Sequence, residues 1–190
     1  MKILVGLGNP GLKYAFTRHN LGFLFLDFYC DSLNTPCNFK KKFHFYYDII
    51  FHCNEKVILV KPDTYMNLSG LAIKEVMNYY KVNEGSLIVC HDDKDLDAGD
   101  VRLKKGGGHG GHRGLKHIIE TLGSTDFLRL RFGIKTERIK DVPLASYVLE
   151  RFEEDEETLY VNAFKKGVKG IEILFCDGDL NRAMKFVNTK

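Results

Sequence analysis

Residues 5–11, Val-Gly-Leu-Gly-Asn-Pro-Gly, close the apolar run that starts at Ile3 and are followed at 17–20 by Thr-Arg-His-Asn. A glycine-rich turn after a short apolar strand lets the backbone approach a ligand closely. Within a dozen residues the chain then adds His19 and Asn20 to the amide of Asn9. A strand that leads into a loop with polar side chains is a common place for an active site on an α/β scaffold. A tight turn before a capped helix explains the same residues, so the segment needs support from elsewhere.

Length and composition indicate one globular domain without a membrane span. The chain has 190 residues, of which 44% are hydrophobic and 12% aromatic, and these values are typical of a globular protein. No run approaches the ~18 apolar residues of a membrane span, and the N-terminal apolar run is too short for a secretory signal. The five cysteines show no C-x-x-C spacing, so we expect reduced, packed thiols in a cytoplasmic protein; they are Cys30, Cys37, Cys53, Cys90 and Cys176.

The net charge of +3 conceals a basic remainder. Five consecutive acidic residues at 153–157 leave +8 on the rest of the chain. Acidic side chains at the start of a helix complement the helix dipole, so this cluster has a structural explanation. The positive remainder is compatible with a polyanionic partner.

Strand-like and helix-like segments alternate along the chain. The apolar patterns predict strands at 2–7, 43–49, 57–60, 87–90, 101–104 and 127–134. They predict helices at 20–33, 71–80 with Ser69 as N-cap, 115–122 closed by Gly123, 153–175 and 179–187. This order predicts a single α/β domain, residues 1–190, with a twisted mixed sheet that is partly parallel and surrounded by helices.

Polar side chains follow three of the predicted strands. Asn9 and His19 come after the first, Asn67 after the strand at 57–60, and Asp92 after the strand that ends at Cys90. If these strands are parallel, their carboxyl ends meet at one edge of the sheet, where ligands bind in open α/β sheets. An imidazole, a carboxylate and two amides would suffice for a hydrolytic site. Local turn and capping bonds are the competing explanation for each residue alone.

A glycine-rich segment at 106–114 contains His109 and His112 at H-x-x-H spacing. No cysteine or further histidine completes a ligand pattern there, and glycines give poor rigidity for a closed zinc site, so we expect no metal and no cofactor. Cations flank the segment at 102, 104, 105, 113 and 116. Such a loop suits a phosphate-bearing ligand, and a solvated surface loop is the alternative.

Two further patterns bear on ligand binding. Arg129 and Arg131 alternate with apolar residues, which places both guanidinium groups on one face of a strand. They would repel each other unless a carboxylate or phosphate lies between them, and an exposed strand face is the alternative. Gly6, Gly8 and Gly11 match the G-x-G-x-x-G dinucleotide fingerprint. Pro10 interrupts it, however, and no second strand ending in an acidic residue follows.

The sequence resembles the bacterial peptidyl-tRNA hydrolase family along nearly its whole length. The matching stretches are VGLGNPGLKYAFTRHNLGF, KPDTYMNLSG, HDDKDLDAG, GGGHGGHRGLKHI, RLRFGI and DVPLASYVLERF. The resemblance implies a single α/β domain with a twisted mixed sheet. It also implies hydrolysis of the ester between a peptide and the 3′-terminal ribose of tRNA, by a monomer without a metal or cofactor.

The resemblance also implies roles for individual residues. His19 corresponds to the catalytic base and Asp92 to its hydrogen-bonded partner. The implied substrate-binding residues are Asn9, Tyr14, Met66, Asn67, His112 and Arg113. Arg113 departs from the asparagine most often expected after that histidine, which leaves its role open. The implied phosphate-binding residues are Arg102, Lys104, Lys105 and Arg131, and strand alternation adds Arg129 to the predicted phosphate-binding set.

Two other classes of function stay open at the level of sequence. One is an RNA-binding protein of this fold without hydrolytic activity, a class that the resemblance links to certain plant splicing factors of similar fold. Retention of Asn9, His19, Asn67 and Asp92 together favours the enzyme. The other is a nucleotide-dependent oxidoreductase, which an NAD(H) binding titration distinguishes.

Overall fold

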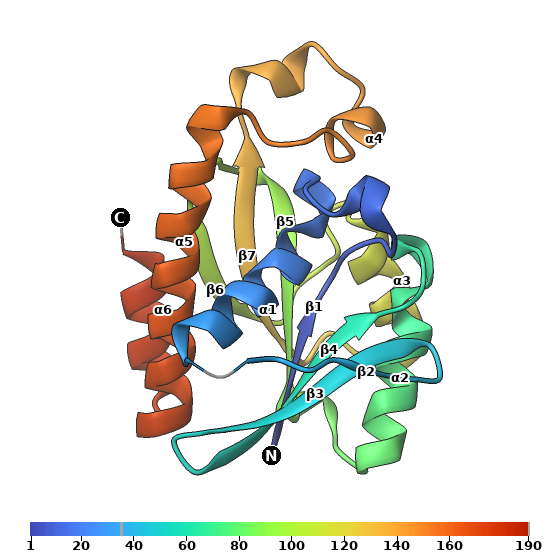
Figure 1. Ribbon diagram of the computed structural model, residues 1–190, viewed down its shortest axis with the longest axis vertical. Helices are drawn as coiled ribbons and strands as arrows, with labels where there is room; N and C mark the ends of the chain where they lie inside the picture. Colours follow the sequence, from blue (N-terminus) through green and yellow to red (C-terminus); the bar gives the residue numbers. More distant parts are fainter. Residues whose placement is uncertain (35, 190) are drawn as a thin grey trace.

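One seven-stranded mixed sheet runs through the computed structural model, which describes residues 1–34 and 36–189 (Figure 1). The strand order is β2-β3-β4-β1-β5-β7-β6. The strands are β1 (Lys2–Gly6), β2 (Lys40–Lys42), β3 (Phe45–His52), β4 (Glu55–Pro62), β5 (Leu87–Asp97), β6 (Val101–Lys105) and β7 (Leu128–Lys135). The predicted α/β class with a partly parallel sheet is confirmed.

Strand β1 lies in the middle of the sheet and pairs in parallel with both β4 and β5. Val5 is opposite Val60 on one side and Val89 on the other, so the carboxyl ends of these three strands lie at one edge. β5 also pairs in parallel with β7, whereas β2, β3 and β6 pair antiparallel with their neighbours. The strands β1, β4 and β5, which carry or precede the polar residues, are therefore parallel, as the sequence predicts.

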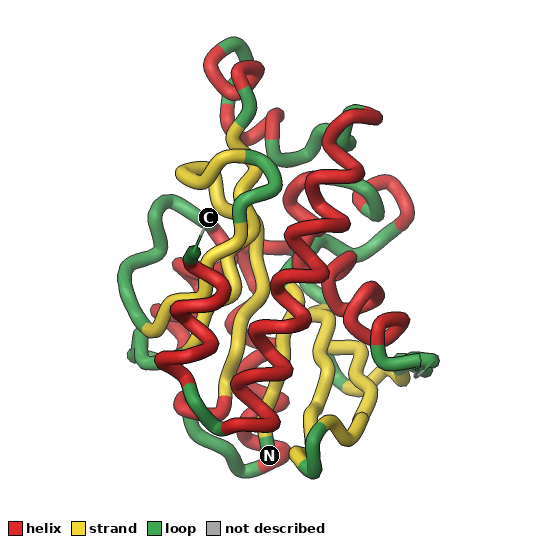
Figure 2. The backbone as a smooth tube through the Cα atoms, turned by 90° about the vertical axis from the view of Figure 1, so that its left-hand side faces the viewer, coloured by secondary structure: helices red, strands yellow, loops and turns green. Residues whose placement is uncertain are grey.

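Helices cover both faces of the sheet, which explains why the central strands are apolar at successive positions. The helices α1 (Leu21–Ser32), α5 (Glu154–Glu172) and α6 (Leu180–Asn188) pack on one face. The helices α2 (Ser69–Tyr80) and α3 (Arg113–Leu122) pack on the other. In Figure 2 helices lie in front of and behind the strands. Alternate residues of β1, Leu4 on one side and Ile3 and Val5 on the other, belong to the two separate cores.

Short helical turns join these elements. They are η1 (Leu12–Tyr14), η2 (Arg18–Asn20), η3 (Met66–Leu68), η4 (Glu84–Ser86), η5 (Glu137–Lys140), α4 (Leu144–Tyr147) and the π-helical turn η6 (Ile173–Asp177). The turns η2 and η3 carry two of the candidate site residues, His19 and Asn67.

Three details of the predicted elements differ from the structure. β5 continues to Asp97, so Asp92 lies within the strand and not after it. Ser69 is the first residue of α2 and Leu68 is its N-cap, and the hydroxyl of Ser69 donates to the carbonyl of Met66. The short elements β2 and α4 have no predicted counterpart, since three or four residues carry too little periodicity to be recognised. Gly123 closes α3 in the left-handed conformation, as predicted.

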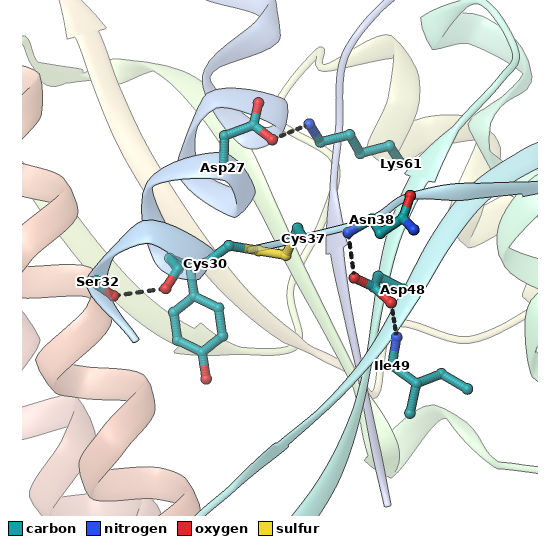
Figure 3. The surroundings of a disulfide bond; sticks show 9 residues. Asp27, Cys30, Ser32, Cys37, Asn38, Asp48, Ile49 and Lys61 are labelled. Atoms are coloured by element: carbon teal, nitrogen blue, oxygen red, sulfur yellow. Dashed lines mark hydrogen bonds and ion pairs between the residues drawn. A yellow bond between two sulfur atoms is a disulfide. The ribbon is translucent and has the colours of Figure 1, made fainter. Parts of the chain in front are cut away.

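The expectation of five reduced cysteines is wrong for four of them in this structure. Cys30 pairs with Cys37 and Cys53 pairs with Cys176, whereas Cys90 is a free, buried thiol. Cys37 lies beside the end of α1, close to the hydrogen bond between Asn38 and Asp48 (Figure 3). The pairs are 7 and 123 residues apart in the sequence, and neither spacing is a recognised motif.

Helix α1 approaches the sheet closely because of Gly22. A Cβ atom at this position would lie 2.3 Å from the backbone nitrogen of Leu7 and 2.4 Å from the carbonyl oxygen of Cys90. A Cβ at Gly6 would in turn lie 2.2 Å from the carbonyl oxygen of Gly22. The helix that follows His19 is therefore seated directly on the end of β1 and on the middle of β5.

We predict that Gly22→Ala destabilises the protein by about 1–3 kcal/mol, the usual cost of overpacking a filled core. The added methyl group would meet backbone atoms, which cannot rotate away as a side chain can. The measurement is urea unfolding followed by circular dichroism. Gly85→Ala is the control, since a Cβ there meets only the side chain of Asn83 at 3.4 Å. Equal stability of the Gly22 variant and the wild type would contradict this account of the packing.

Candidate active site

Three segments meet beyond the carboxyl ends of β1 and β4 and beside the middle of β5, and they bring together the residues that the sequence predicts. Asn9 follows β1, Asn67 lies in η3 after β4, and Asp92 lies in β5. They line a cleft of about 800 Å³. Its lining also includes His19, Met66, His91, Asp93, Lys104, His112, Arg113, Arg129, Arg131, Leu144 and Val148. The cleft joins the amides and carboxylates beside the central strands to several cations.

His19 is held from both its backbone and its ring. Its backbone N–H donates to the carbonyl of Val148 at 2.8 Å, and its Nδ1 lies 2.8 Å from Oδ1 of the buried Asp92. Because a carboxylate only accepts hydrogen bonds, Nδ1 carries the proton. Nε2 therefore has a free lone pair, which is what a general base requires.

His112 donates to the same carboxylate oxygen. Its Nε2 lies 3.0 Å from Asp92 Oδ1, while its Nδ1 accepts the backbone N–H of Leu115 at 3.2 Å and caps α3. One ring nitrogen is a donor and the other an acceptor, so the neutral imidazole has both positions satisfied. His112 therefore fixes Asp92 and the start of α3 and has no free lone pair for proton transfer.

Asp92 is ionised in this environment. Burial by itself would raise the pKa of its carboxyl group, but the neighbouring imidazoles of His19 and His112, which both hydrogen-bond its Oδ1, hold the pKa well below its usual value. The carboxylate is thus stabilised by the two ring N–H groups that it accepts.

His91 is a site residue that the sequence reasoning did not single out. Its Nδ1 lies 2.7 Å from the carbonyl oxygen of Asp92, and its ring centroid lies 5.0 Å from that of His112. Burial and the neighbouring His112 lower the pKa of His91 to about 3. Its Nε2 is buried without a hydrogen-bond partner among the described residues. A neutral imidazole thus lies behind Asp92, and no sequence spacing distinguishes it.

Asn9 is fixed by a reciprocal amide arrangement. Its backbone N–H donates to Asn20 Oδ1 and its carbonyl accepts from Asn20 Nδ2, both at 2.9 Å. Its own Oδ1 accepts the backbone N–H of Met66 at 2.8 Å. Because that contact requires an oxygen, the Nδ2 amide of Asn9 is the group left for a ligand. Asn20, the last residue of the Thr-Arg-His-Asn stretch at 17–20, thus positions Asn9.

Asn67 and Tyr14 are less constrained. The Asn67 side chain is exposed in the cleft and makes no hydrogen bond with another described residue. Tyr14 does not line the cleft, but its ring packs edge-on against that of Tyr65, which does, at a centroid distance of 6.4 Å. Asn67 can therefore bind a ligand directly, whereas Tyr14 lies outside the cleft lining, beside Tyr65.

A buried ion pair next to His19 was not anticipated from the sequence. Arg18 donates to the carboxylate of Glu156 and to the carbonyl of Arg151, and its guanidinium stacks on Tyr147 at 4.5 Å. Glu156 also accepts the backbone N–H of Glu153 in a capping box at the start of α5. The acidic cluster at 153–157 thus caps a helix, as expected, and also fixes the turn that carries His19.

Arg129 holds the glycine loop, residues 106–114. Its guanidinium is 3% exposed and donates to the carbonyls of Gly107 and Gly108. Burial lowers the pKa of Arg129, and the positive charge of the nearby Arg131 lowers it further. Arg129 and Arg131 both line the cleft, as strand alternation predicts. The guanidinium of Arg129, however, is directed to backbone carbonyls.

The other predicted cations differ in their surroundings. Arg131 Nε donates to Asp93 at 2.7 Å, so a carboxylate of the protein itself contacts this guanidinium group. Lys104 and Arg113 line the cleft. Arg102 and Lys105 are outside its lining, and they approach Asp100 at 3.5 Å and Asp126 at 3.0 Å.

His19, Asp92 and His112 could also be considered as metal ligands, since their ligand atoms lie within 4.8 Å of one another. The atoms that face each other already form the hydrogen bonds of 2.8 and 3.0 Å described above. A metal ion there would have to displace both ring protons. This geometry suits proton transfer better than metal binding, and the site contains the groups of a carboxylic ester hydrolase.

Comparisons with known proteins give the family. The model of the peptidyl-tRNA hydrolase family matches residues 3–190. A peptidyl-tRNA hydrolase of Caldicellulosiruptor bescii is 42% identical over 98% of this chain and 96% of the relative. One from Coxiella burnetii is 42% identical over 97% and 96%. The crystal structure of peptidyl-tRNA hydrolase from Acinetobacter baumannii has a TM-score of 0.91 at 34% identity, covering 100% of this chain and 95% of that one.

The chain belongs to the peptidyl-tRNA hydrolase family. It is an enzyme that hydrolyses peptidyl-tRNA, and neither a non-hydrolytic RNA-binding protein nor an oxidoreductase is favoured by these similarities. Among residues 1–34 and 36–189, no helix is both long and apolar enough to cross a membrane.

We predict that His91 makes stability fall on mild acidification. The folded state keeps His91 neutral down to about pH 3, whereas the unfolded chain binds a proton near the ordinary pKa of 6.5. Because the unfolded state binds more protons below pH 6.5, stability decreases there, by about 2 kcal/mol at pH 5. His91→Gln should reduce the difference between urea midpoints at pH 7 and pH 5. His109→Gln, in the exposed part of the glycine loop, should not, and equal effects of both variants would reject the assignment.

Proposed function

We propose that ester hydrolysis by this enzyme uses His19 as general base and Asp92 as its partner. The observation that carries the proposal is the short contact between His19 Nδ1 and Asp92 Oδ1, which leaves Nε2 as the basic nitrogen at the cleft. A water molecule that donates to Nε2 can attack the ester carbonyl. Asp92 then stabilises the imidazolium that forms.

With Nδ1 of His19 bonded to Asp92, Nε2 is the atom that carries the proton through the proposed reaction. Nε2 takes one proton as the water oxygen bonds to the carbonyl carbon. The bond to the ribose oxygen then breaks, and the proton passes from Nε2 to that oxygen. The peptide leaves as a carboxylic acid, which keeps the second proton of the water and then releases it to solvent, and the tRNA leaves with a free terminal hydroxyl. His112 keeps Asp92 in place during these steps without itself exchanging a proton.

The amides are proposed to bind the peptide. Asn9 Nδ2 is free to donate, because the Oδ1 of Asn9 is occupied by Met66. Asn67 offers both amide atoms in the cleft, where it can bind the reacting carbonyl or the attacking water. Met66 supplies an apolar wall, and Tyr14 beside Tyr65 is placed for contact with the terminal nucleotide.

The cations are proposed to bind tRNA phosphates. Lys104, Arg113 and Arg131 line the cleft, and Arg102 and Lys105 extend the positive charge along β6. Arg131 uses Nε for Asp93, which leaves its two terminal nitrogens for a phosphate. The contribution of Arg129 is indirect in this proposal, through the glycine loop that it holds.

We further propose that the enzyme works as a monomer in the cytoplasm. All the groups used above come from one chain, so the mechanism requires no second copy. Its substrate is a product of translation, which takes place in that compartment.

We predict that His19→Ala lowers kcat by about 10²- to 10⁴-fold, the usual contribution of a positioned general base. Asp92→Asn should lower kcat less, because the imidazole persists without its orienting anion. The measurement is release of free tRNA from N-acetyl-aminoacyl-tRNA at saturating substrate. His44→Ala, which removes an exposed histidine outside the cleft lining, is the control. Activity of His19→Ala within threefold of wild type would exclude the assignment.

We predict that Arg131→Ala raises KM and flattens its salt dependence, with little change in kcat, because each phosphate contact contributes a counterion-release term. Asn67→Ala should instead lower kcat and leave the salt slope unchanged, since its amide acts at the reacting carbonyl. KM is measured over a series of salt concentrations. Arg182→Ala, which removes a cation on α6, should leave the slope unchanged. A wild-type slope in Arg131→Ala would mean that the tRNA binds elsewhere.

A further inference from the structure

A second cluster of metal-ligating side chains lies outside the cleft. His52, Cys53 and Cys176 each offer one ligand atom, and these atoms all lie within 4.8 Å of one another. In the structure the two cysteines form a disulfide, with their Cα atoms 4.9 Å apart. Both cysteines are exposed and His52 is half-buried, so solutes can reach the group.

The cluster joins two segments that are far apart in the sequence. His52 ends β3 and Cys53 lies in the two-residue turn before β4, where Cys53 and Asn54 adopt the left-handed conformation at φ 51° and 61°. Cys176 lies in the π-helical turn η6 between α5 and α6. In Figure 1 the β3–β4 hairpin and the connection between α5 and α6 lie in the lower part, away from α4.

The ring of His52 is oriented by a buried neighbour. The hydroxyl of Tyr29, a fully buried residue of α1, lies 2.5 Å from His52 Nδ1. Metal-bound histidines commonly use one ring nitrogen for the metal and the other for a hydrogen bond of this kind. With Nδ1 engaged by Tyr29, Nε2 is the ring nitrogen that is left for a metal ion.

We propose that, when the disulfide is reduced, His52, Cys53 and Cys176 bind one Zn²⁺ ion, with water in the fourth position. Two thiolates, one imidazole and a water form a known tetrahedral zinc ligand set. Two sulfurs at about 2.3 Å from one Zn²⁺ lie roughly 3.8 Å apart. Because both cysteine side chains are exposed, they can separate to that distance without disturbing the core.

The exchange between the two forms balances as follows. A thiol reductant of the glutathione class donates two electrons and is itself oxidised to a disulfide, and Cys53 and Cys176 become thiols with two added protons. Zn²⁺ then binds both as thiolates and releases two protons, without any change in its own oxidation state. Either form links the β3–β4 hairpin to the C-terminal helices.

The other cysteines provide internal comparisons. Among the described residues, no third ligating group joins Cys30 and Cys37. Cys90 is fully buried in the core. The histidine–aspartate group of the cleft contains no sulfur. A metal ion bound through thiolates and an imidazole therefore identifies the proposed site.

Co²⁺ is the probe, because it replaces Zn²⁺ and gives a thiolate-to-metal charge-transfer absorption that nitrogen and oxygen ligands do not give. The full-length protein is reduced, freed of reductant without air and titrated with Co²⁺, and Zn²⁺ is then added. We expect a charge-transfer band that saturates at one equivalent and disappears with Zn²⁺. Protein with the disulfide intact should give no such band. Absence of the band from the reduced protein would overturn the proposal.

Variants identify the ligands. Loss of a residue that only hydrogen-bonds to a metal ligand typically costs about 10- to 100-fold in metal affinity. The variants Cys53→Ser, Cys176→Ser and His52→Asn each remove a proposed ligand itself, so each should lower the affinity by at least that factor. The double variant Cys30→Ser/Cys37→Ser should keep the wild-type band and affinity. Circular dichroism of each variant verifies that it is folded. Wild-type binding by any of the three single variants, or its loss only in the double variant, would contradict the site.

Discussion

The active site depends on one oxygen atom of a buried carboxylate. Oδ1 of Asp92 accepts hydrogen bonds from His19 and from His112, which come from segments on either side of β5 in the sequence. A buried charge is unfavourable unless it is paired and hydrogen-bonded, so the two ring N–H groups are needed for the carboxylate to remain ionised. The same two bonds fix the tautomers of both histidines. Asp92 therefore determines which imidazole has a free lone pair, and it ties the turn of His19 to the start of α3.

The sequence predicted those parts of the site that depend on strand order. Asn9, Asn67 and Asp92 come after or near the ends of apolar runs, and parallel pairing of β1 with β4 and β5 brings them together. That inference requires only the patterns of successive apolar residues and the rule that parallel strands share a carboxyl edge. His19 belongs to the same edge because Gly22 lets α1 begin directly above β1 and β5. The exact end of β5 was not predicted, since polar residues continue a strand wherever pairing continues.

Contacts between residues far apart in the sequence have no recognisable sequence pattern, so they were not predicted. Arg18 and Glu156 are 138 residues apart, and a charge within a polar-rich segment gives no sign that it will be buried. The pairing of Cys53 with Cys176 spans 123 residues and is likewise set by the position of the β3–β4 hairpin against η6. His91 could not be distinguished from an ordinary strand residue. In each case the partner is chosen by the tertiary fold, which periodicity and local spacing do not encode.

Arg129 illustrates the limit of arguments from charge. Alternation along β7 correctly places it with Arg131 on the face that lines the cleft, but alternation does not indicate what covers that face. The glycine loop has few side chains with which to pack, so its position has to be fixed through its backbone. The guanidinium of Arg129 does so by donating to two successive carbonyls, Gly107 and Gly108, and it is almost wholly buried as a result. A cation that strand alternation predicts to bind a phosphate is thereby used to shape the cleft. In the proposed function, direct phosphate contacts are then left to the cleft cations whose donors are still free, Lys104, Arg113 and the terminal nitrogens of Arg131.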